Sequence, residues 1–251
     1  MARRTVARYA FILFLLALFY APQRAEAAVC AAAAAQGTAP SGWQTYCWLD
    51  FSSYNDTTAR TGAGQNFSFN LSDGSTLTFN VKTSGTPTRV SRAAPSWTGS
   101  AVGNTAFLGI PNRPILYSQA GGTNVVTFSG ITITPPPGVP AVSAYAFVAA
   151  DAESTNETES LSFNTNGSNW VILDQVNPIS GSVYPTISGA GTPTFTENGV
   201  AGTVGGYIVG SNSATTVTTT MVGGGLQGVM FAVRFASIRL NKQISGARVD
   251  A

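Results

Sequence analysis

A run of acidic residues at positions 151–159 is the part of this 251-residue sequence whose composition most directly suggests chemistry. The run reads DAESTNETE and directly follows the apolar stretch at residues 145–150. Ca²⁺ takes about six to eight oxygen ligands from carboxylates, amides and carbonyls. A strand that ends in clustered oxygens is a suitable place for such a cation, so we predict a calcium site at Asp151, Glu153 and Glu157. The alternative is a solvated loop that carries ordinary surface acids.

The same loop and one tryptophan could form a ligand-binding surface. Trp97 lies in the irregular stretch PSWTG at residues 95–99. Its ring could stack on a sugar, while Asp151, Glu153 and Asn156 could bind hydroxyl groups. If so, Asp151→Ala should abolish binding with little change in melting temperature. Packing in the core is the alternative for any tryptophan.

Paired carboxylates offer an enzymatic alternative. Retaining glycosidases use two carboxylates about 5 Å apart, and Glu153, Glu157, Glu159 and Asp174 could supply such a pair. The Glu-x-Asp-x-x-Glu pattern of some jelly-roll glycosidases is missing. The sequence also contains no histidine, which removes Ser-His-Asp catalysis and the usual zinc sites. We therefore predict a binding protein rather than an enzyme.

The elements that must position these residues are short β strands. No segment keeps a helical period for three turns, and the Asp73-Gly74 turn predicts a hairpin. A dozen strands at this spacing predict an all-β fold, an antiparallel β-sandwich or jelly roll. The predicted strands cover residues 46–51, 66–71, 75–81, 123–128, 131–134, 141–149, 160–164, 170–173, 192–196, 207–209, 214–221 and 226–235.

Charge and composition exclude several classes of partner. Charged residues make up 10% of the chain, against about 25% in an average soluble protein. After residue 27 the chain has nine basic and ten acidic residues. We therefore expect no nucleic-acid partner and no polybasic membrane patch.

The N-terminus has the pattern of a secretory signal peptide over residues 1–27. Arg3, Arg4 and Arg8 precede an apolar run at residues 9–21, and Ala25-Glu26-Ala27 is a small-x-small cleavage site. The apolar run is shorter than the roughly 20 residues that span a bilayer, so we expect cleavage and no stable membrane insertion. The alternative is a membrane anchor.

Three further segments follow the predicted cleavage. Residues 28–42 form a leader of small residues, residues 43–235 form the sandwich, and residues 236–251 are either the start of a truncated repeat or a frayed tail. In an oxidising compartment the simplest pairing of Cys30 and Cys47 is one disulfide. It would close a loop of about 18 residues and contribute on the order of 3 kcal/mol.

Several phrases together resemble a known family. They are YCWLDF at 46–51, DGSTL at 73–77, FLGIP at 107–111, AFVAADAES at 146–154 and GLQGVMFAVR at 225–234. In this order the chain resembles the second non-repetitive domain of CshA-type bacterial surface adhesins, over roughly residues 43–235. The resemblance implies a lectin-like β-sandwich on a surface fibril that binds host glycoprotein or glycan. Ig-like repeats commonly follow that domain, and residues 238–249 look like the first strand of one.

The sequence therefore predicts a secreted or cell-surface adhesin module whose partner is host glycoprotein or glycan. Two alternatives stay open: a secreted glycoside hydrolase, and a structural subunit of a surface fibril. A calcium ion is the only cofactor that the residues suggest.

Overall fold

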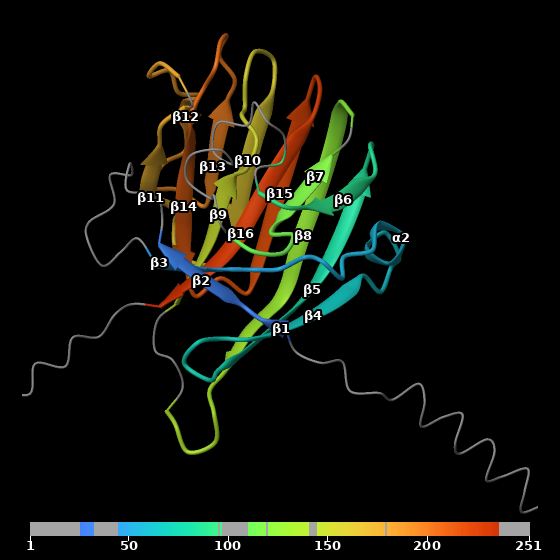
Figure 1. Ribbon diagram of the computed structural model, residues 1–251, viewed down its shortest axis with the longest axis vertical. Coiled ribbons are helices and arrows are strands. Elements are labelled where there is room, and N and C mark those ends of the chain that lie inside the picture. The colour runs from blue at the N-terminus through green and yellow to red at the C-terminus, as the bar shows by residue number, and fades with distance from the viewer. Residues whose placement is uncertain are drawn as a thin grey trace, which may run out of the picture.

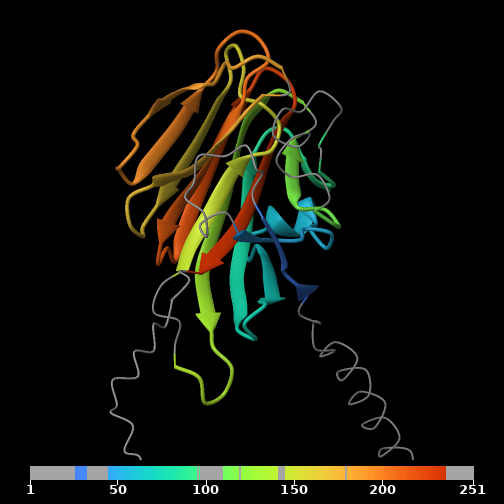
Figure 2. The same ribbon diagram turned by 60° about the vertical axis from the view of Figure 1, so that its left-hand side comes forward.

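The predicted all-β sandwich is confirmed. The computed structural model describes residues 26–32, 45–94, 96, 110–118, 120–140, 145–178 and 180–235. Within these ranges the chain is almost entirely β strand, with one short helix, α2 (Asp56–Ala59). Two sheets pack face to face as two layers (Figures 1 and 2). The Asn55 side chain caps α2 by accepting a hydrogen bond from the Thr58 backbone N–H.

The first sheet, sheet A, carries the predicted hairpin and most of the Ser- and Thr-rich strands. Its strands pair antiparallel, except that β1 pairs with β4 in parallel. Their spatial order is β1 (Glu26–Ala27), β4 (Gln65–Asn70), β5 (Thr76–Gly85), β8 (Gly122–Thr134), β15 (Thr216–Gly223), β10 (Ser160–Thr165), β13 (Thr194–Asn198) and β12 (Thr186–Ser188).

The second sheet, sheet B, contains the more apolar strands. The pairs within it are antiparallel, and β7 and β6 extend from β16 beside the main path. The main order is β11 (Val171–Val176), β14 (Gly206–Asn212), β9 (Tyr145–Asp151), β16 (Gln227–Phe235), β3 (Thr45–Trp48) and β2 (Val29–Ala32); β6 spans Arg89–Arg92 and β7 spans Ile115–Ser118.

One strand differs clearly from the sequence prediction. Residues 123–128 and 131–134 belong to the single strand β8, not to two strands. Gly130 has φ of 63°, and the β5–β8 register shifts opposite it. A glycine that adopts a left-handed conformation makes a bulge without interrupting the strand. The sequence pattern of a turn at this position is therefore the pattern of a bulge.

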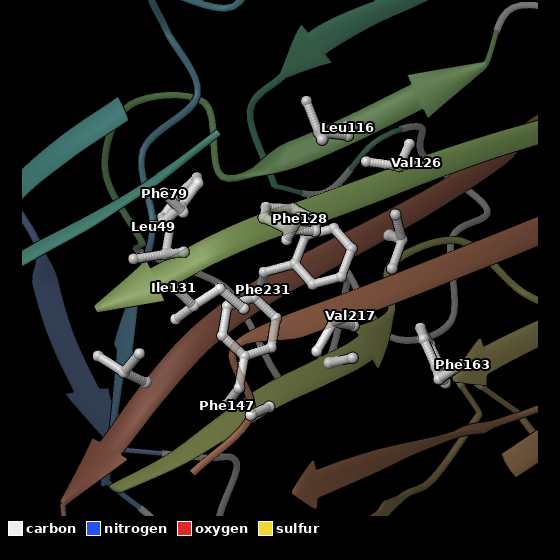
Figure 3. Packing of buried hydrophobic residues seen from close by; sticks show 14 of the residues in the cluster. Leu49, Phe79, Leu116, Val126, Phe128, Ile131, Phe147, Phe163, Val217 and Phe231 are labelled. Carbon is white, nitrogen blue, oxygen red and sulfur yellow. The ribbon is translucent and has the colours of Figure 1, made fainter. Parts of the chain in front are cut away.

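The main core lies between the two sheets. Alternate residues of each strand point inward, as period-2 geometry requires. Phe128 of β8 meets Phe231 of β16 with ring centroids 4.4 Å apart, and Phe147 of β9 and Phe79 of β5 join them at 5.3 and 5.2 Å (Figure 3). Burial of each such ring stabilises the fold by about 1.5–3 kcal/mol.

A second buried cluster lies on the opposite face of sheet B. It contains Tyr46, Trp48, Val148 and Met230, which alternate along their strands with residues of the main core. Strands that are buried on both faces read as continuous apolar runs. This explains why residues 145–150 show no polar alternation, and it makes Trp48 a core residue.

Candidate functional site

A pocket opens where the acidic loop after β9 meets the turn between β15 and β16. It has a volume of about 330 Å³, and we call it the loop-end pocket. The residues that line it are Glu153, Asn156, Glu157, Thr158, Glu159, Gly224, Gly225 and Leu226. Three of the residues predicted for ligand or metal binding, Glu153, Asn156 and Glu157, therefore do line one pocket.

Asp151 holds the acidic loop from the inside. It is the last residue of β9 and shares the inward face with Phe147 and Ala149, so only 1% of it is exposed. One carboxylate oxygen accepts a hydrogen bond from the Glu153 backbone N–H at 2.9 Å, and the other accepts from the Thr155 hydroxyl at 2.8 Å. Asp151 therefore shapes the loop and does not line the pocket.

Glu159 joins the two walls of the pocket. Its Oε2 accepts a hydrogen bond from the Asn156 backbone N–H at 3.2 Å. Burial raises the pKa of Glu159, while the nearby polar groups of Asn156, Gln227, Gly224 and Gly225 oppose that rise. The carboxylate thus lies between the acidic loop and the β15–β16 turn.

The ligand-facing part of the pocket consists of its more exposed members. Asn156 is half-buried, Glu157 is exposed, and Leu226 is 41% exposed. Glu157 adopts a left-handed φ of 49°, which a non-glycine residue rarely does, and its N–H donates to the Val200 carbonyl at 2.9 Å. These groups offer an amide, a carboxylate and an apolar surface, a mixture suited to hydrogen bonding and van der Waals contact with a ligand.

Glu153 contributes less than predicted. Only 5% of it is exposed, and its Oε2 accepts a hydrogen bond from the Ser154 backbone N–H at 2.7 Å. It lines the pocket, but most of its surface is taken up by the protein itself.

Sequence reasoning missed a second carboxyl group beneath this loop. Glu197 of β13 points inward from sheet A, next to Phe195 in the alternation, and is fully buried. Neither carboxyl oxygen has a hydrogen bond of normal geometry, although the Tyr207 backbone N–H lies near enough to lower its pKa slightly. Burial raises the pKa of Glu197 well above its ordinary value, and the charge of Asp151 adds to the rise.

The same environment affects Asp151. Burial raises its pKa from an ordinary 3.8 to about 6, against the hydrogen bonds from Glu153 and Thr155 that favour the charged form. The interior below the loop-end pocket thus contains two buried carboxyl groups, and the charge of Asp151 disfavours the ionisation of Glu197. The charge of Glu159 contributes to the raised pKa of Asp151.

The predicted calcium site is not assembled. Within the described residues, no group of three or more His, Cys, Asp or Glu side chains gathers to hold a metal ion. The reason is local: Asp151 points into the core, whereas Glu157 is on the exposed side of the loop.

Of the other predicted site residues, the structure describes Asp174 but not Trp97. Asp174, a candidate for a catalytic pair, is buried on β11 and is not among the residues that line the pocket. Trp97 lies outside the described residues, as do residues 1–25 of the signal peptide and the tail at 236–251. Their predicted roles stay predictions.

The two cysteines lie opposite each other in neighbouring strands. β2 pairs with β3 so that the Cα atoms of Cys30 and Cys47 are direct partners. Direct cross-strand partners lie about 4.5–5.5 Å apart between Cα atoms, which is within the range that a disulfide spans. The register is therefore compatible with the predicted disulfide.

These features define a class: an antiparallel β-sandwich with a small polar pocket at one end, built from loops. The sequence profile of the family described as surface adhesin CshA non-repetitive domain 2 matches residues 44–234. The chain belongs to this family of surface adhesin domains. Neither the curated proteins nor the solved structures gave a significant match.

Family membership has two direct consequences. The protein is a cell-surface or secreted protein with a role in adhesion, as predicted. That role implies binding rather than catalysis. No helix in the described part of the chain is long and apolar enough to cross a membrane.

Proposed function

We propose that this chain is an exported adhesin module that binds host glycoprotein or glycan through the loop-end pocket. The observation that carries the proposal is the pocket itself, where Asn156, Glu157 and Leu226 present polar and apolar surface next to each other. Membership in a family of adhesin domains supports a binding role for such a site.

The construction of the pocket also supports a binding role. Its framework is fixed by bonds that a ligand does not need to break: Asp151 to Thr155 at 2.8 Å, and Glu159 to the Asn156 backbone at 3.2 Å. A preorganised site loses less entropy when it binds, so more of the contact energy becomes affinity. Asn156 and Glu157 are then available for the hydroxyl groups of a sugar or for polar groups of a protein.

The carboxylate of Glu157 in the pocket predicts which hydrogen-bonding groups the ligand should present. Glu157 can accept hydrogen bonds but cannot donate them when it is ionised. The ligand should therefore present donors at this position, such as vicinal hydroxyl groups. Glu157→Gln retains the shape of the side chain and one acceptor, and should weaken binding less than Glu157→Ala.

The test is binding of the purified protein to a glycan array and to immobilised extracellular glycoproteins, before and after enzymatic deglycosylation. We expect saturable binding that Glu157→Ala weakens at least tenfold, about 1.4 kcal/mol, without a change in melting temperature. Binding that survives deglycosylation would assign the ligand to the protein part of the glycoprotein. Binding that Glu157→Ala leaves unchanged would remove the pocket from the proposal.

A further inference from the structure

The outward face of sheet A carries almost no charge. Residues alternate along its strands, so those between the buried ones point away from the core. At the outward positions of β4, β5, β8, β15, β10 and β13, Lys82 is the one charged residue, and nearly all the others are serine, threonine or asparagine. This face can form many hydrogen bonds, but its composition favours neither an anion nor a cation.

A hollow lies in this face beside the bulge in β8. It has a volume of about 440 Å³, and we call it the sheet hollow. Phe67 and Phe79, which border it, point into the main core. By alternation, the side chains that line it from the outward face belong to Asn66, Ser68, Thr78, Asn80 and Ser129, and Gly130 completes the lining.

The bulge explains why the hollow is there. β5 pairs with β8 through Thr78 and Thr132 on one side of the register shift, and through Asn80 and Ser129 on the other. β8 therefore has one residue more than β5 between these pairs, and such an extra residue bends the strand. Gly130 has φ of 63°, and apart from its chain neighbours nothing lies within 4 Å of where its Cβ would stand. The hollow is thus open above Gly130.

Most of the polar groups in the hollow are available to a ligand. One group is tied: Nδ2 of Asn80 donates to Oδ1 of Asn66 at 2.8 Å and to the Ala63 carbonyl at 2.9 Å. Within the described residues, the remaining hydroxyl groups of the hollow form no hydrogen bond; they belong to Ser68, Thr78 and Ser129. A hydroxyl group can both donate and accept a hydrogen bond.

We propose that the sheet hollow is a second binding site and that it takes an uncharged sugar residue of a glycan. The hydroxyl groups of a sugar also donate and accept, so they match this lining. No carboxylate, ammonium or guanidinium group lines the hollow, so an acidic sugar finds no cation there. The volume lies within the roughly 300–1,000 Å³ that is usual for ligand sites.

The sheet hollow and the loop-end pocket differ in place and in chemistry. β8 begins at Gly122, beside the turn that forms one wall of the loop-end pocket, and reaches the hollow at Ser129. These positions are seven residues apart, or roughly 23 Å along the strand. The loop-end pocket contains carboxylates, whereas the hollow contains none. The proposal of the hollow therefore does not rest on the proposed function of the pocket.

The test measures binding of soluble neutral oligosaccharides of glucose, galactose, mannose and N-acetylglucosamine to the exported protein by calorimetry. The protein carries Glu157→Ala, so that the loop-end pocket contributes little. We expect at least one oligosaccharide to bind, with a Kd that changes less than about twofold between about 50 and 500 mM salt, because no charge lies in the hollow.

A matched pair of glycine substitutions places the bound sugar. Asparagine tolerates a left-handed φ, so Gly130→Asn should fill the hollow without disturbing the bulge. Gly138→Asn is the control, because Gly138 has φ of 81°, equally open surroundings and no part in the lining. We expect Gly130→Asn to weaken binding at least about tenfold and Gly138→Asn to leave it unchanged. Thr78→Val removes one hydroxyl group at constant shape and should weaken binding roughly three- to tenfold.

Three results would overturn the proposal. The first is that no oligosaccharide of the panel binds the Glu157→Ala protein. The second is binding that Gly130→Asn and Thr78→Val both leave unchanged, which would place the sugar elsewhere. The third is an equal loss of binding in Gly130→Asn and Gly138→Asn. Binding by the wild type that Glu157→Ala abolishes would overturn the hollow and support the loop-end pocket, whereas binding that only Gly130→Asn abolishes would do the reverse.

Discussion

Replacement of the buried carboxyl group of Glu197 should stabilise the protein in a pH-dependent way. Glu197 is fully buried on β13, close to the charge of Asp151, and burial raises its pKa well above the ordinary 4.5. Above the ordinary pKa and up to the raised one, the folded state therefore holds a proton that the unfolded state has already lost. Folding must take up that proton, at a cost of about 1.4 kcal/mol per pH unit.

The sign and the size follow from this proton. Between the two pKa values the folded state binds more protons, so the free energy of unfolding falls as pH rises. Each pH unit between the ordinary pKa of Glu197 and its raised pKa in the folded state lowers the free energy of unfolding by about 1.4 kcal/mol. Asp151 acts in the same direction between its ordinary pKa of 3.8 and about 6.

Glu197→Gln removes the proton uptake and nearly retains the volume. We expect the variant to match the wild type near the ordinary pKa of 4.5 and to exceed it increasingly as the pH rises above that value, measured as the free energy of unfolding in urea at each pH. Glu157→Gln, at an exposed carboxylate of the pocket, is the matched control and should leave the curve unchanged. Parallel curves for the wild type and Glu197→Gln would refute the reasoning, because they would show that no proton is taken up at Glu197.

Three further predictions concern the acidic loop, the two cysteines and calcium. Asp151→Ala should lower the free energy of unfolding in urea by about 2–4 kcal/mol, because the buried Glu153 N–H and Thr155 hydroxyl lose their acceptor. An unchanged free energy of unfolding would contradict the structural role of Asp151 and favour its predicted role in ligand binding. Reduction of the exported protein should lower its free energy of unfolding by about 3 kcal/mol if Cys30 and Cys47 form a disulfide. A Cys30→Ser, Cys47→Ser double variant should show no change with reductant. A wild-type protein whose free energy of unfolding does not change with reductant would contradict the disulfide. EDTA and millimolar Ca²⁺ should leave the melting temperature unchanged, because the described acidic residues form no metal cluster, and a Ca²⁺-dependent rise would restore the predicted site.

The fold was predictable because polar and apolar residues alternate in most strands. In sheet A the pattern of β4 and β5 directly identifies which residues point inward, and Asp73-Gly74 marks the turn between them. Two short elements gave too little signal. β12 has three residues, and all of them are exposed, so no polar–apolar alternation appears in it. α2 has only four residues, which are too few to show the hydrophobic period of a helix.

The candidate site was predictable in its place but not in its geometry. The acidic loop does line a pocket, but β9 is buried on both faces, so its sequence gives no sign of which face Asp151 takes. Counting by two places Asp151 on the same face as Phe147, but the sequence does not show that this face is the one between the two sheets. The same count from Phe195 would have found Glu197, whose carboxyl group looks like a surface residue in the polar sequence TFTEN.

The opposite wall of the pocket was not predictable from the loop alone. Gly224 and Gly225 reach it because β15 pairs with β8 and β16 pairs with β9. That contact depends on pairing between segments roughly 80–100 residues apart in sequence, which a local pattern does not contain.

The central claim is that the loop-end pocket is the adhesive site, and a matched pair of apolar substitutions tests it most directly. Leu226 in the pocket is 41% exposed, and Val139 is 53% exposed. Val139 follows the end of β8 at Thr134, whereas the turn with Leu226 lies beside the start of that strand at Gly122. The two residues therefore mark opposite ends of the sandwich.

The measurement is the Kd of Leu226→Ala and of Val139→Ala for the tightest-binding glycoprotein or glycan of the panel, with the melting temperature of each variant. The account predicts at least a fivefold weaker Kd for Leu226→Ala, about 1 kcal/mol, and an unchanged Kd for Val139→Ala, with both variants as stable as the wild type. Equal affinities for the two variants, or a loss confined to Val139→Ala, would contradict it and move the adhesive surface away from this end of the fold.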